Sequence, residues 1–313
     1  MTLRHLLSSA DLSVAEQASL VDRARELKAS RGVHPRPLEG RSVGVLFEKP
    51  STRTRVSFEV ALVELGAHPV ALRGNELQLG RGETVEDTAR VFSRYLHGLV
   101  VRTFGQDRLA ALASASSVPV VNALTDLEHP CQALADILTI AERFDDLARV
   151  DVAYLGDGNN VCHSLLLAGA LAGLHSITVA SPPGYEPEEA IVERAAAIGG
   201  ETGTRIRVTE APGDASASAH VLYTDVWASM GQEAERQARL EAFQGYQVSS
   251  ARLADADPSA IVLHCLPAHR GEEIATEVID GPSSAVWDQA ENRLHAQKAL
   301  LEWLLGAQPG DKP

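Results

Sequence analysis

The chain has 313 residues, of which 45% are hydrophobic and 22% are charged, so it has room for about two globular domains and is too apolar to be intrinsically disordered. It carries 28 Lys and Arg against 42 Asp and Glu, which gives a net charge of −14. Such an acidic chain is poorly matched to nucleic acid or to an anionic membrane, and we expect neither as a partner. Any anion that it binds must be held by a local group of arginines against the overall field.

Cysteine usage and the apolar runs indicate a cytoplasmic protein. The three cysteines are an odd number and suit a reducing compartment better than a disulfide scaffold. The apolar run near the N-terminus is too short for a signal peptide. The richest apolar stretch, residues 165–174, is broken by Gly169 and Gly173 and is too short to span a membrane.

Short apolar runs alternate with helical patterns from about residue 42 onward, and this alternation predicts an α/β fold with doubly wound parallel sheets, one in each half. The expected strands of the first half are 42–47, 68–72, 98–102 and 118–122. The expected helices there include 51–65, a helix capped by Thr84, and 130–144. A new series begins near residue 150, with expected strands at 150–155, 176–180, 205–209, 221–224 and 261–265 and a last helix from about Asn292 to Leu305.

The segment that follows the first expected strand predicts an anion site. Residues 48–55 have the sequence Glu-Lys-Pro-Ser-Thr-Arg-Thr-Arg and lead from a strand into a helix N-terminus. Free backbone N–H groups and the helix dipole favour an anion there, and Arg adds a planar fork suited to phosphate. Because Arg53 and Arg55 project about 200° apart on a regular helix, we expect only one to touch the ligand, and favour Arg53. The alternative is a well-capped helix with solvated arginines.

Two further strand ends carry candidate polar residues. Arg102 closes the third expected strand, either as a ligand contact or as a charged strand terminator. Pro130 suits the first turn of a helix, which places His129 near the cap and Gln132 about one turn inside. A helix N-terminus disfavours imidazolium, so we expect a neutral His129 that can donate a hydrogen bond, unless a bound dianion offsets this effect. A structural histidine is the alternative.

The second half begins with a run that invites a dinucleotide-binding interpretation. Residues 156–160 have the sequence Gly-Asp-Gly-Asn-Asn, but Val161 stands at the third glycine position of the fingerprint. The strand that ends at Ala180 is followed by Ser-Pro-Pro-Gly instead of an acidic residue. We therefore expect no nicotinamide cofactor, and a small ligand held through Asn160 is the alternative.

The last two strand ends supply a carboxylate, a loop and a candidate metal cluster. Asp225 is a natural partner for an ammonium group, and residues 229–231 (Ser-Met-Gly) have the composition of a mobile lid or of an ordinary surface loop. His264, Cys265 and His269 could suggest a metal site. Because adjacent residues on a strand face opposite ways, we expect no metal there.

Taken together, these motifs resemble the aspartate/ornithine carbamoyltransferase family over essentially the whole chain. The family's carbamoyl-phosphate signature Ser-Thr-Arg-Thr-Arg stands at 51–55, and its His-Pro-x-Gln motif stands at 129–132. The Asp-x-x-x-Ser-Met-Gly loop at 225–231, the His-Cys-Leu-Pro motif at 264–267 and the run at 77–88 are typical of the members that use ornithine.

The resemblance implies an activity, a fold and an assembly. The carbamoyl group of carbamoyl phosphate would pass to the δ-amine of ornithine, giving citrulline and phosphate, most commonly in arginine biosynthesis and without a metal or an organic cofactor. Two Rossmann-like domains would share the substrates, residues 1–145 binding carbamoyl phosphate and 146–313 binding ornithine, while the C-terminal helix 292–306 would pack back on the first domain. The active unit would be a homotrimer in which Gln78 reaches into a neighbouring subunit's site.

The resemblance also implies a role for each motif residue. The residues that would bind carbamoyl phosphate are Ser51, Thr52, Arg53, Thr54, Gln78, Arg102, His129, Gln132, Cys265, Leu266 and Arg293, the last of which would open the final helix. Those that would bind ornithine are Asn160, Asp225, Ser229 and Met230. Arg102, His129 and Cys265 would lie nearest the chemistry, and the bond from Leu266 to Pro267 is a candidate cis peptide.

Several other functions stay open at this point. A related carbamoyltransferase could accept aspartate, putrescine or an acylated ornithine, and an ornithine enzyme could instead run backward in arginine breakdown. A non-catalytic relative could keep the fold and only bind anions. A dehydrogenase is the remaining alternative.

Overall fold

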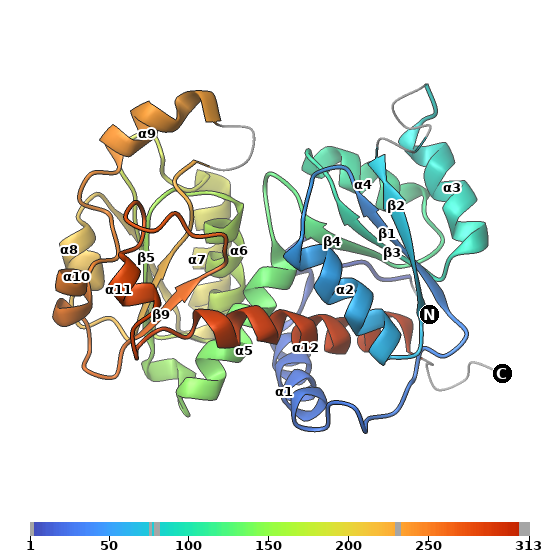
Figure 1. The fold of residues 1–313 in the computed structure, drawn as a ribbon, viewed down its shortest axis with the longest axis horizontal. Helices are drawn as coiled ribbons and strands as arrows, with labels where there is room; N and C mark the ends of the chain where they lie inside the picture. The colour runs from blue at the N-terminus through green and yellow to red at the C-terminus, as the bar shows by residue number, and fades with distance from the viewer. Residues whose placement is uncertain (1–2, 75–76, 78–81, 229–232, 307–313) are drawn as a thin grey trace. The chain divides into compact units, whose positions relative to one another are not determined.

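The structure is a computed structural model that describes residues 3–74, 77, 82–228 and 233–306 (Figure 1). The chain divides into two compact units. Unit 1 comprises residues 1–135 together with 292–313, and unit 2 comprises residues 136–291. The chain passes from one unit to the other inside helices α5 (Pro130–Arg143) and α12 (Val286–Leu305).

Unit 1 is built on a four-stranded parallel sheet in the order β2-β1-β3-β4. Its strands are β1 (Ser42–Phe47), β2 (His68–Arg73), β3 (Gly98–Arg102) and β4 (Val120–Leu124). Its helices include α1 (Val14–Ala29), α2 (Arg53–Glu64), α3 (Val85–Tyr95) and α4 (Gln106–Ala115). Because the chain visits β2 on one side of β1 and then β3 on the other, the strand order reverses between β1 and β3.

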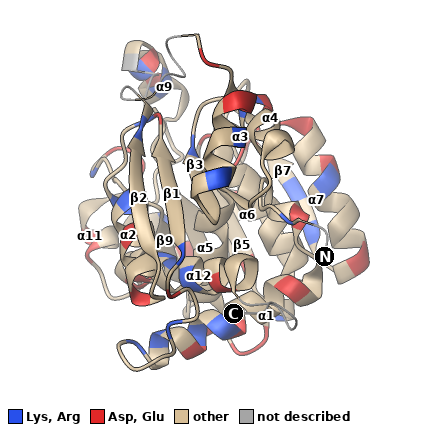
Figure 2. Cartoon of the chain, turned by 90° about the vertical axis from the view of Figure 1, so that its right-hand side faces the viewer, with Lys and Arg blue, Asp and Glu red and all other residues tan. Residues whose placement is uncertain are grey.

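Strands β1, β3 and β4 of unit 1 are apolar and mostly buried, whereas the edge strand β2 is partly exposed. Alternate β3 residues Leu99 and Val101 join a core cluster that also contains Leu109 and Leu112 of α4, and all five residues of β3 are buried. In Figure 2, the β1 ribbon has the colour of uncharged residues, whereas the α1 ribbon contains both acidic and basic residues. Burial on both faces thus explains why β1, β3 and β4 stand in the sequence as short continuous apolar runs.

Helix α1, for which the sequence analysis made no prediction, begins at a capping box. The Ser13 side chain accepts from the backbone N–H of Glu16, and the Glu16 carboxylate reaches back to the N–H of Ser13. Further along the helix, Arg23 pairs with Glu302 on the last part of α12. Helix α1 is therefore tied to the C-terminal segment of unit 1.

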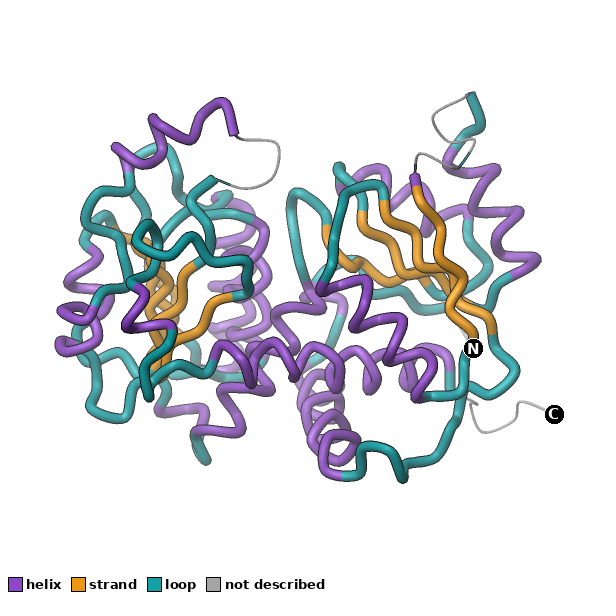
Figure 3. Tube along the Cα trace, viewed as in Figure 1, coloured by secondary structure: helices purple, strands orange, loops and turns teal. Residues whose placement is uncertain are grey.

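Unit 2 contains a five-stranded parallel sheet in the order β7-β6-β5-β8-β9, seen with its helices in Figure 3. The strands are β5 (Asp151–Leu155), β6 (Ser176–Ala180), β7 (Arg205–Thr209), β8 (Val221–Thr224) and β9 (Ile261–His264). The helices are α6 (Asn160–Leu171), α7 (Glu189–Thr202), α8 (Pro212–Ser216), α9 (Arg236–Ala242), α10 (Ser250–Asp255) and α11 (Thr276–Ile279). Here the strand order reverses between β5 and β8.

The expected pair of doubly wound parallel sheets is confirmed, and the expected strands all form to within two residues at each end. The expected start of the last helix is wrong, because α12 begins at Val286. Asn292 lies in the interior of this helix. It is fully buried, and its side-chain oxygen accepts from Lys28 Nζ at 2.8 Å. Arg293 therefore lies inside α12 and does not open it.

The apolarity of the helices and the state of the cysteines bear on the environment expected for the chain. Among the helices of the described ranges, none is both long enough and apolar enough to cross a membrane. Cys131, Cys162 and Cys265 are all buried and unbridged. Helix α6 accounts for the apolar stretch at 165–174, because every residue from Val161 to Leu171 is buried in unit 2.

A buried polar group in unit 2 provides a test of this packing. The Tyr223 hydroxyl on β8 donates to Asp136 Oδ2 at 3.0 Å, and burial and the nearby Asp136 raise the pKa of Tyr223 well above its ordinary value. We predict that Tyr223→Phe lowers the free energy of unfolding by about 1.5–3 kcal/mol, because a buried carboxylate loses a donor. Tyr246→Phe removes a hydroxyl that donates to the Glu210 carbonyl at 2.7 Å, and it should lower the free energy of unfolding by only about 0.5–1.5 kcal/mol. Urea titrations of the two variants and the wild type measure both losses. Equal losses would contradict this difference.

Candidate active site

The two strand-order reversals identify where ligands can bind. In doubly wound sheets, the crevice beyond the carboxyl ends of the strands opens at the position where the order reverses. In unit 1 this position lies between β1, which leads into the start of α2, and β3, which ends at Arg102. In unit 2 it lies between β5, followed by residues 156–160, and β8, followed by Asp225.

The start of α2 has the features of an anion site. Thr52 stands at the N-cap position but makes no side-chain cap hydrogen bond, so the alternative of a well-capped helix is not what the structure contains. Arg55 pairs with Glu59 one turn later, Nε to Oε1 at 2.8 Å. Arg53 is exposed and makes no hydrogen bond or ion pair within the described ranges. This arrangement favours Arg53 over Arg55 as the residue available to an anion.

Two arginines that are distant in sequence are both buried in unit 1. Arg102 is 6% exposed and Arg293 is 4% exposed, which does not fit Arg102 as a solvated strand terminator. Arg293 donates to the hydroxyl of Thr54, the buried second residue of α2. The helix start, the β3 end and α12 therefore bring cationic and hydroxyl groups into one part of unit 1.

His129 lies within reach of the field of both arginines. It is buried, and its pKa is held well below the ordinary value, first by burial and then by Arg293 and Arg102. The expected neutral imidazole is thus favoured, although the causes are burial and two guanidiniums, whereas the sequence argument used the helix N-terminus. Helix α5 begins at Pro130 as expected, and the His129 carbonyl accepts from the N–H of the buried Gln132 at 3.0 Å.

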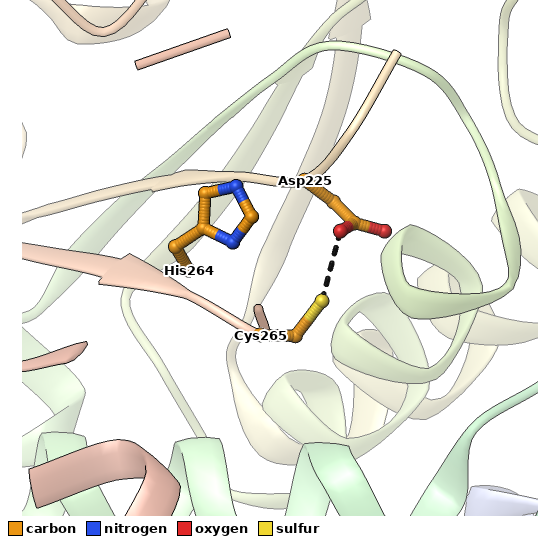
Figure 4. A group of neighbouring side chains, drawn as sticks. All are labelled: Asp225, His264 and Cys265. Carbon is orange, nitrogen blue, oxygen red and sulfur yellow. Dashed lines mark hydrogen bonds between the residues drawn. The ribbon is translucent and has the colours of Figure 1, made fainter. Parts of the chain in front are cut away.

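Asp225 in unit 2 is held by two donors from different loops. It is 5% exposed, and its Oδ2 accepts from Asn159 Nδ2 at 2.8 Å. The Cys265 thiol donates to Asp225 Oδ1 with an Sγ-to-oxygen distance of 2.9 Å, as drawn in Figure 4. The ends of β5, β8 and β9 therefore meet at this carboxylate.

Asn159 is a site residue that the sequence analysis missed. Its Oδ1 caps α6 by accepting from the N–H groups of Val161 at 2.9 Å and Cys162 at 3.2 Å, which leaves its amide to donate to Asp225. The known preference for Asn at N-cap positions could have indicated it. Asn160, which the sequence analysis chose, is the first residue of α6. Gln78, Ser229 and Met230 lie outside the described residues.

A second buried carboxylate makes this edge of unit 2 acidic. Burial raises the pKa of Asp157 to about 6, although Arg239 opposes that shift. Arg239 Nη1 donates to Asp157 Oδ2 at 3.0 Å and to the Trp227 carbonyl at 2.9 Å. This arginine was also missed by the sequence analysis, and it joins the loop after β5 to the loop after β8.

The glycines of the Gly-Asp-Gly-Asn-Asn run have backbone explanations. Gly156 has a φ of 144°, a conformation that side chains disfavour. A Cβ on Gly158 would lie 2.1 Å from the backbone nitrogen of Pro187, so only glycine fits there. Both glycines are thus required by the local path of the chain.

The expectation that His264 and Cys265 face opposite ways is wrong. Strand β9 ends at His264, so the alternation does not extend to Cys265, and one ligand-type atom from each of Asp225, His264 and Cys265 lies within 4.8 Å of the others. Both ring nitrogens of His264 nevertheless have hydrogen-bond partners. Nδ1 accepts from the Leu266 N–H at 2.9 Å, and Nε2 lies 3.1 Å from Glu273 Oε1. A metal ion would have to break one of these bonds.

The segment after Cys265 has an unusual backbone. The peptide bond from Leu266 to Pro267 is cis, which confirms the expectation. Leu266 has a φ of 60°, in the left-handed region that few residues other than glycine adopt. The carbonyl of Leu266 therefore takes a direction that a regular extension of β9 would not give it.

Comparison with known proteins adds two family matches. A family described as the carbamoyl-phosphate-binding domain of aspartate/ornithine carbamoyltransferase matches residues 4–142. The Asp/Orn-binding domain of the same family matches residues 148–304.

Similar proteins cover nearly the full length of the chain. An ornithine carbamoyltransferase of Parafrankia sp. (strain EAN1pec) is 59% identical over 308 residues, 97% of each chain, and one of Acidothermus cellulolyticus is 60% identical over 309 residues, 98% of each. A solved ornithine carbamoyltransferase from Pyrococcus furiosus has a TM-score of 0.93 at 47% identity, covering 99% of this chain and 98% of its own. One from Gloeobacter violaceus has a TM-score of 0.88 at 49% identity, covering 98% and 100%.

The lowered pKa of His129 predicts a pH dependence of stability. Below about pH 6.5 the unfolded chain binds a proton on this ring that the native state does not bind. As the pH is lowered, this group should therefore reduce the free energy of unfolding by up to about 1.4 kcal/mol for each pH unit. His129→Gln should remove that contribution, so the wild type loses more stability than the variant between about pH 7.5 and about pH 5.5 in urea titrations. His68→Gln, at an exposed position, is the control. Parallel pH dependence of wild type and His129→Gln would contradict the assignment.

Proposed function

The chain belongs to the aspartate/ornithine carbamoyltransferase family, and we propose that it transfers the carbamoyl group of carbamoyl phosphate to the δ-amine of L-ornithine, giving L-citrulline and phosphate. The observation that carries this proposal is the opposite charge of the two strand edges. The edge in unit 1 gathers the guanidiniums of Arg102 and Arg293, whereas the edge in unit 2 gathers the carboxylate of Asp225 and the ion pair of Asp157 with Arg239, so its net charge is negative. A phosphate dianion suits the first edge, and a diamino acid suits the second.

The phosphate group binds at the start of α2. Ser51, Thr52 and Thr54 supply hydroxyls, and the backbone N–H groups of the first helical turn point outward with the positive end of the dipole. Arg53 supplies a bidentate fork, which is supported by its exposed position and by the pairing of Arg55 with Glu59. Gln78, from a neighbouring subunit, completes this contact.

The carbamoyl carbonyl is polarised by groups that surround it in unit 1. Attack by an amine places negative charge on that oxygen, and Arg102, His129 and Thr54 stabilise the charge. Loss of one such donor typically lowers the rate by about 10²–10³-fold. A neutral His129 donates this hydrogen bond without adding a third positive charge, Gln132 binds the carbamoyl nitrogen, and Arg293 orients Thr54.

Ornithine binds at the acidic edge of unit 2. Asp225 binds the α-ammonium group, assisted by Asn160 and by Ser229 and Met230 of the following loop. The attacking δ-amine must be neutral. With a pKa near that of lysine, only about one molecule in 2,500 has this form at pH 7, a cost of about 4.6 kcal/mol. A carboxylate favours the charged form of a nearby amine, so Asp225 suits the α-ammonium and not the δ-amine. The δ-amine lies at Cys265 and the Leu266 carbonyl instead, and it must lose its proton before it attacks.

The domain organisation follows the same division of substrates. We assign residues 1–145 to carbamoyl phosphate and 146–313 to ornithine, with the C-terminal helix 292–306 packing on the first domain. The family matches over 4–142 and 148–304 support the boundary. The hydrogen bond from Arg293 to Thr54 and that from Lys298 to Glu64 support the placement of the helix.

The assembly, compartment and direction are part of the same proposal. A homotrimer is the active unit, because Gln78 serves a neighbouring subunit's site. The protein acts in the cytoplasm, which its three unbridged cysteines support. It runs in the direction of arginine biosynthesis, the commoner role. Light scattering of the purified protein tests the trimer, and steady-state kinetics in both directions test the direction.

A citrulline assay tests the activity directly. The purified protein is supplied with carbamoyl phosphate and, in turn, with ornithine, putrescine, N-acetylornithine and aspartate. We expect carbamoylation of ornithine at a rate far above that of the other amines. Faster reaction of another amine would replace ornithine as the substrate, and no product with any of them would refute the proposal.

Replacement of Arg53 separates the two substrates. Arg53→Ala should raise the KM for carbamoyl phosphate by about 10- to 100-fold, because a charged hydrogen bond to phosphate is lost, while the KM for ornithine changes little. Arg55→Ala is the matched control, since this side chain pairs with Glu59, and it should leave both values nearly unchanged. Similar losses for both substrates in Arg53→Ala would contradict the phosphate assignment.

A further inference from the structure

We propose that His264 and Glu273 are positioning residues that set the backbone of Leu266, so that its carbonyl can accept a hydrogen bond from the carbamoyl nitrogen. Neither side chain touches substrate in this proposal. Both act through the peptide group that follows Cys265. The inference rests on the proposed function, because it concerns how the carbamoyl group is held.

The hydrogen bonds define one state of the imidazole. The Leu266 N–H donates to His264 Nδ1 at 2.9 Å, so this nitrogen must carry a lone pair. The ring proton is therefore on Nε2, which lies 3.1 Å from Glu273 Oε1. The Glu273 carboxylate accepts the proton of Nε2, and this leaves Nδ1 as the acceptor that holds the Leu266 N–H.

Burial makes this arrangement rigid. His264 is 1% exposed and Glu273 is 0% exposed, so neither group has water as an alternative partner. Glu273 Oε1 also accepts from the backbone N–H of His269 at 2.5 Å. The turn that carries Glu273 is closed by a hydrogen bond from Gly271 N to the Ile274 carbonyl at 2.8 Å. The carboxylate is therefore anchored by the backbone of its own turn.

The backbone of Leu266 requires such support. Its φ of 60° is disfavoured for a residue with a bulky side chain, and such conformations persist only where the surroundings hold them. The bond from Leu266 to His264 closes the chain on both sides of Cys265. It fixes the plane of the peptide group between Cys265 and Leu266, and so where the Cys265 thiol projects, which is onto Asp225 Oδ1 at 2.9 Å. From that plane, the φ of 60° and the restricted ψ of a residue before proline set the direction of the Leu266 carbonyl.

The strand side of the turn is anchored separately. The backbone N–H of His264 donates to Gln289 Oε1 at 2.8 Å, and Gln289 in turn donates to Asp136 Oδ1 at 2.7 Å. Replacement of the His264 side chain leaves these backbone contacts in place. The effect of such a replacement therefore reports on the two hydrogen bonds that link Glu273 through His264 to Leu266, here called the relay, and not on the end of β9 as a whole.

Two substitutions at His264 divide the relay into its two bonds. In His264→Asn, the amide oxygen occupies the place of Nδ1 and can still accept from Leu266, while the bond to Glu273 is lost. In His264→Gln, the amide nitrogen occupies the place of Nε2 and can still donate to Glu273, while the acceptor for Leu266 is lost. Binding is measured by calorimetry with inorganic phosphate and with the carbamoyl phosphate analogue that has CH2 in place of the bridging oxygen.

We expect His264→Gln to lose about tenfold or more in affinity for the analogue and less than about twofold for phosphate, which has no group for the Leu266 carbonyl. His264→Asn should stay within about threefold of the wild type for both ligands. Glu273→Gln, which preserves the side-chain volume, should also lose affinity for the analogue more than for phosphate, but by a smaller factor than His264→Gln. It replaces His264→Gln in the test if that variant does not fold. His68→Gln, at an exposed position in unit 1, is the control.

The outcomes separate this inference from the proposed function. Equal behaviour of His264→Asn and His264→Gln, or equal loss of phosphate and analogue, would overturn the positioning role. Failure of the wild type to form citrulline would instead refute the carbamoyltransferase activity. A fall in kcat for citrulline formation that follows the loss of analogue affinity would support the role of Leu266 in both the ground state and the transition state.

Discussion

The alignment of parallel strands is the constraint on which the rest of the structure depends. All strands of each sheet run in the same direction, so the loops at their carboxyl ends share one edge, and polar residues distant in sequence meet there. This is how Thr54 and Arg102 come to share an edge in unit 1, and Asn159, Asp225 and Cys265 in unit 2. Local helix caps and hydrogen bonds then refine positions that the sheet has already set.

Burial turns these edges into opposite electrostatic environments in a chain of net charge −14. In unit 1, burial first, and then the nearby guanidiniums of Arg293 and Arg102, lower the pKa of His129 and favour its neutral form. In unit 2, the carboxylate of Asp157 has a pKa of about 6 even beside Arg239, because desolvation outweighs the ion pair. The overall charge of the chain therefore says little about either edge, and the buried residues decide what each edge attracts.

The sequence predicted the sheets well because buried parallel strands are short, apolar and bounded by polar residues, as in Gly98–Arg102. It failed where tertiary contacts override local pattern. The last helix was expected to begin near Asn292, yet α12 begins at Val286 and the Asn292 side chain accepts a hydrogen bond from Lys28 inside it. The pairing of Asn159 with Asp225 and of His264 with Glu273 joins residues from separate segments, and no spacing in the sequence encodes those distances. The motif residues were found through family resemblance, whereas their supporting partners required coordinates.

The discontinuity of unit 1 has a consequence for the order in which the protein is made. Residues 136–291 interrupt this unit, so its final segment leaves the ribosome only after all of unit 2. Arg293, which holds Thr54, and Lys298, whose ammonium group donates to Glu64 at 2.8 Å, both belong to that segment. A nascent chain that stops before residue 292 already contains every strand of both sheets, yet it lacks the Arg293 guanidinium that donates to Thr54. Domains usually fold as they emerge, but here the first-synthesised unit is the last to be completed.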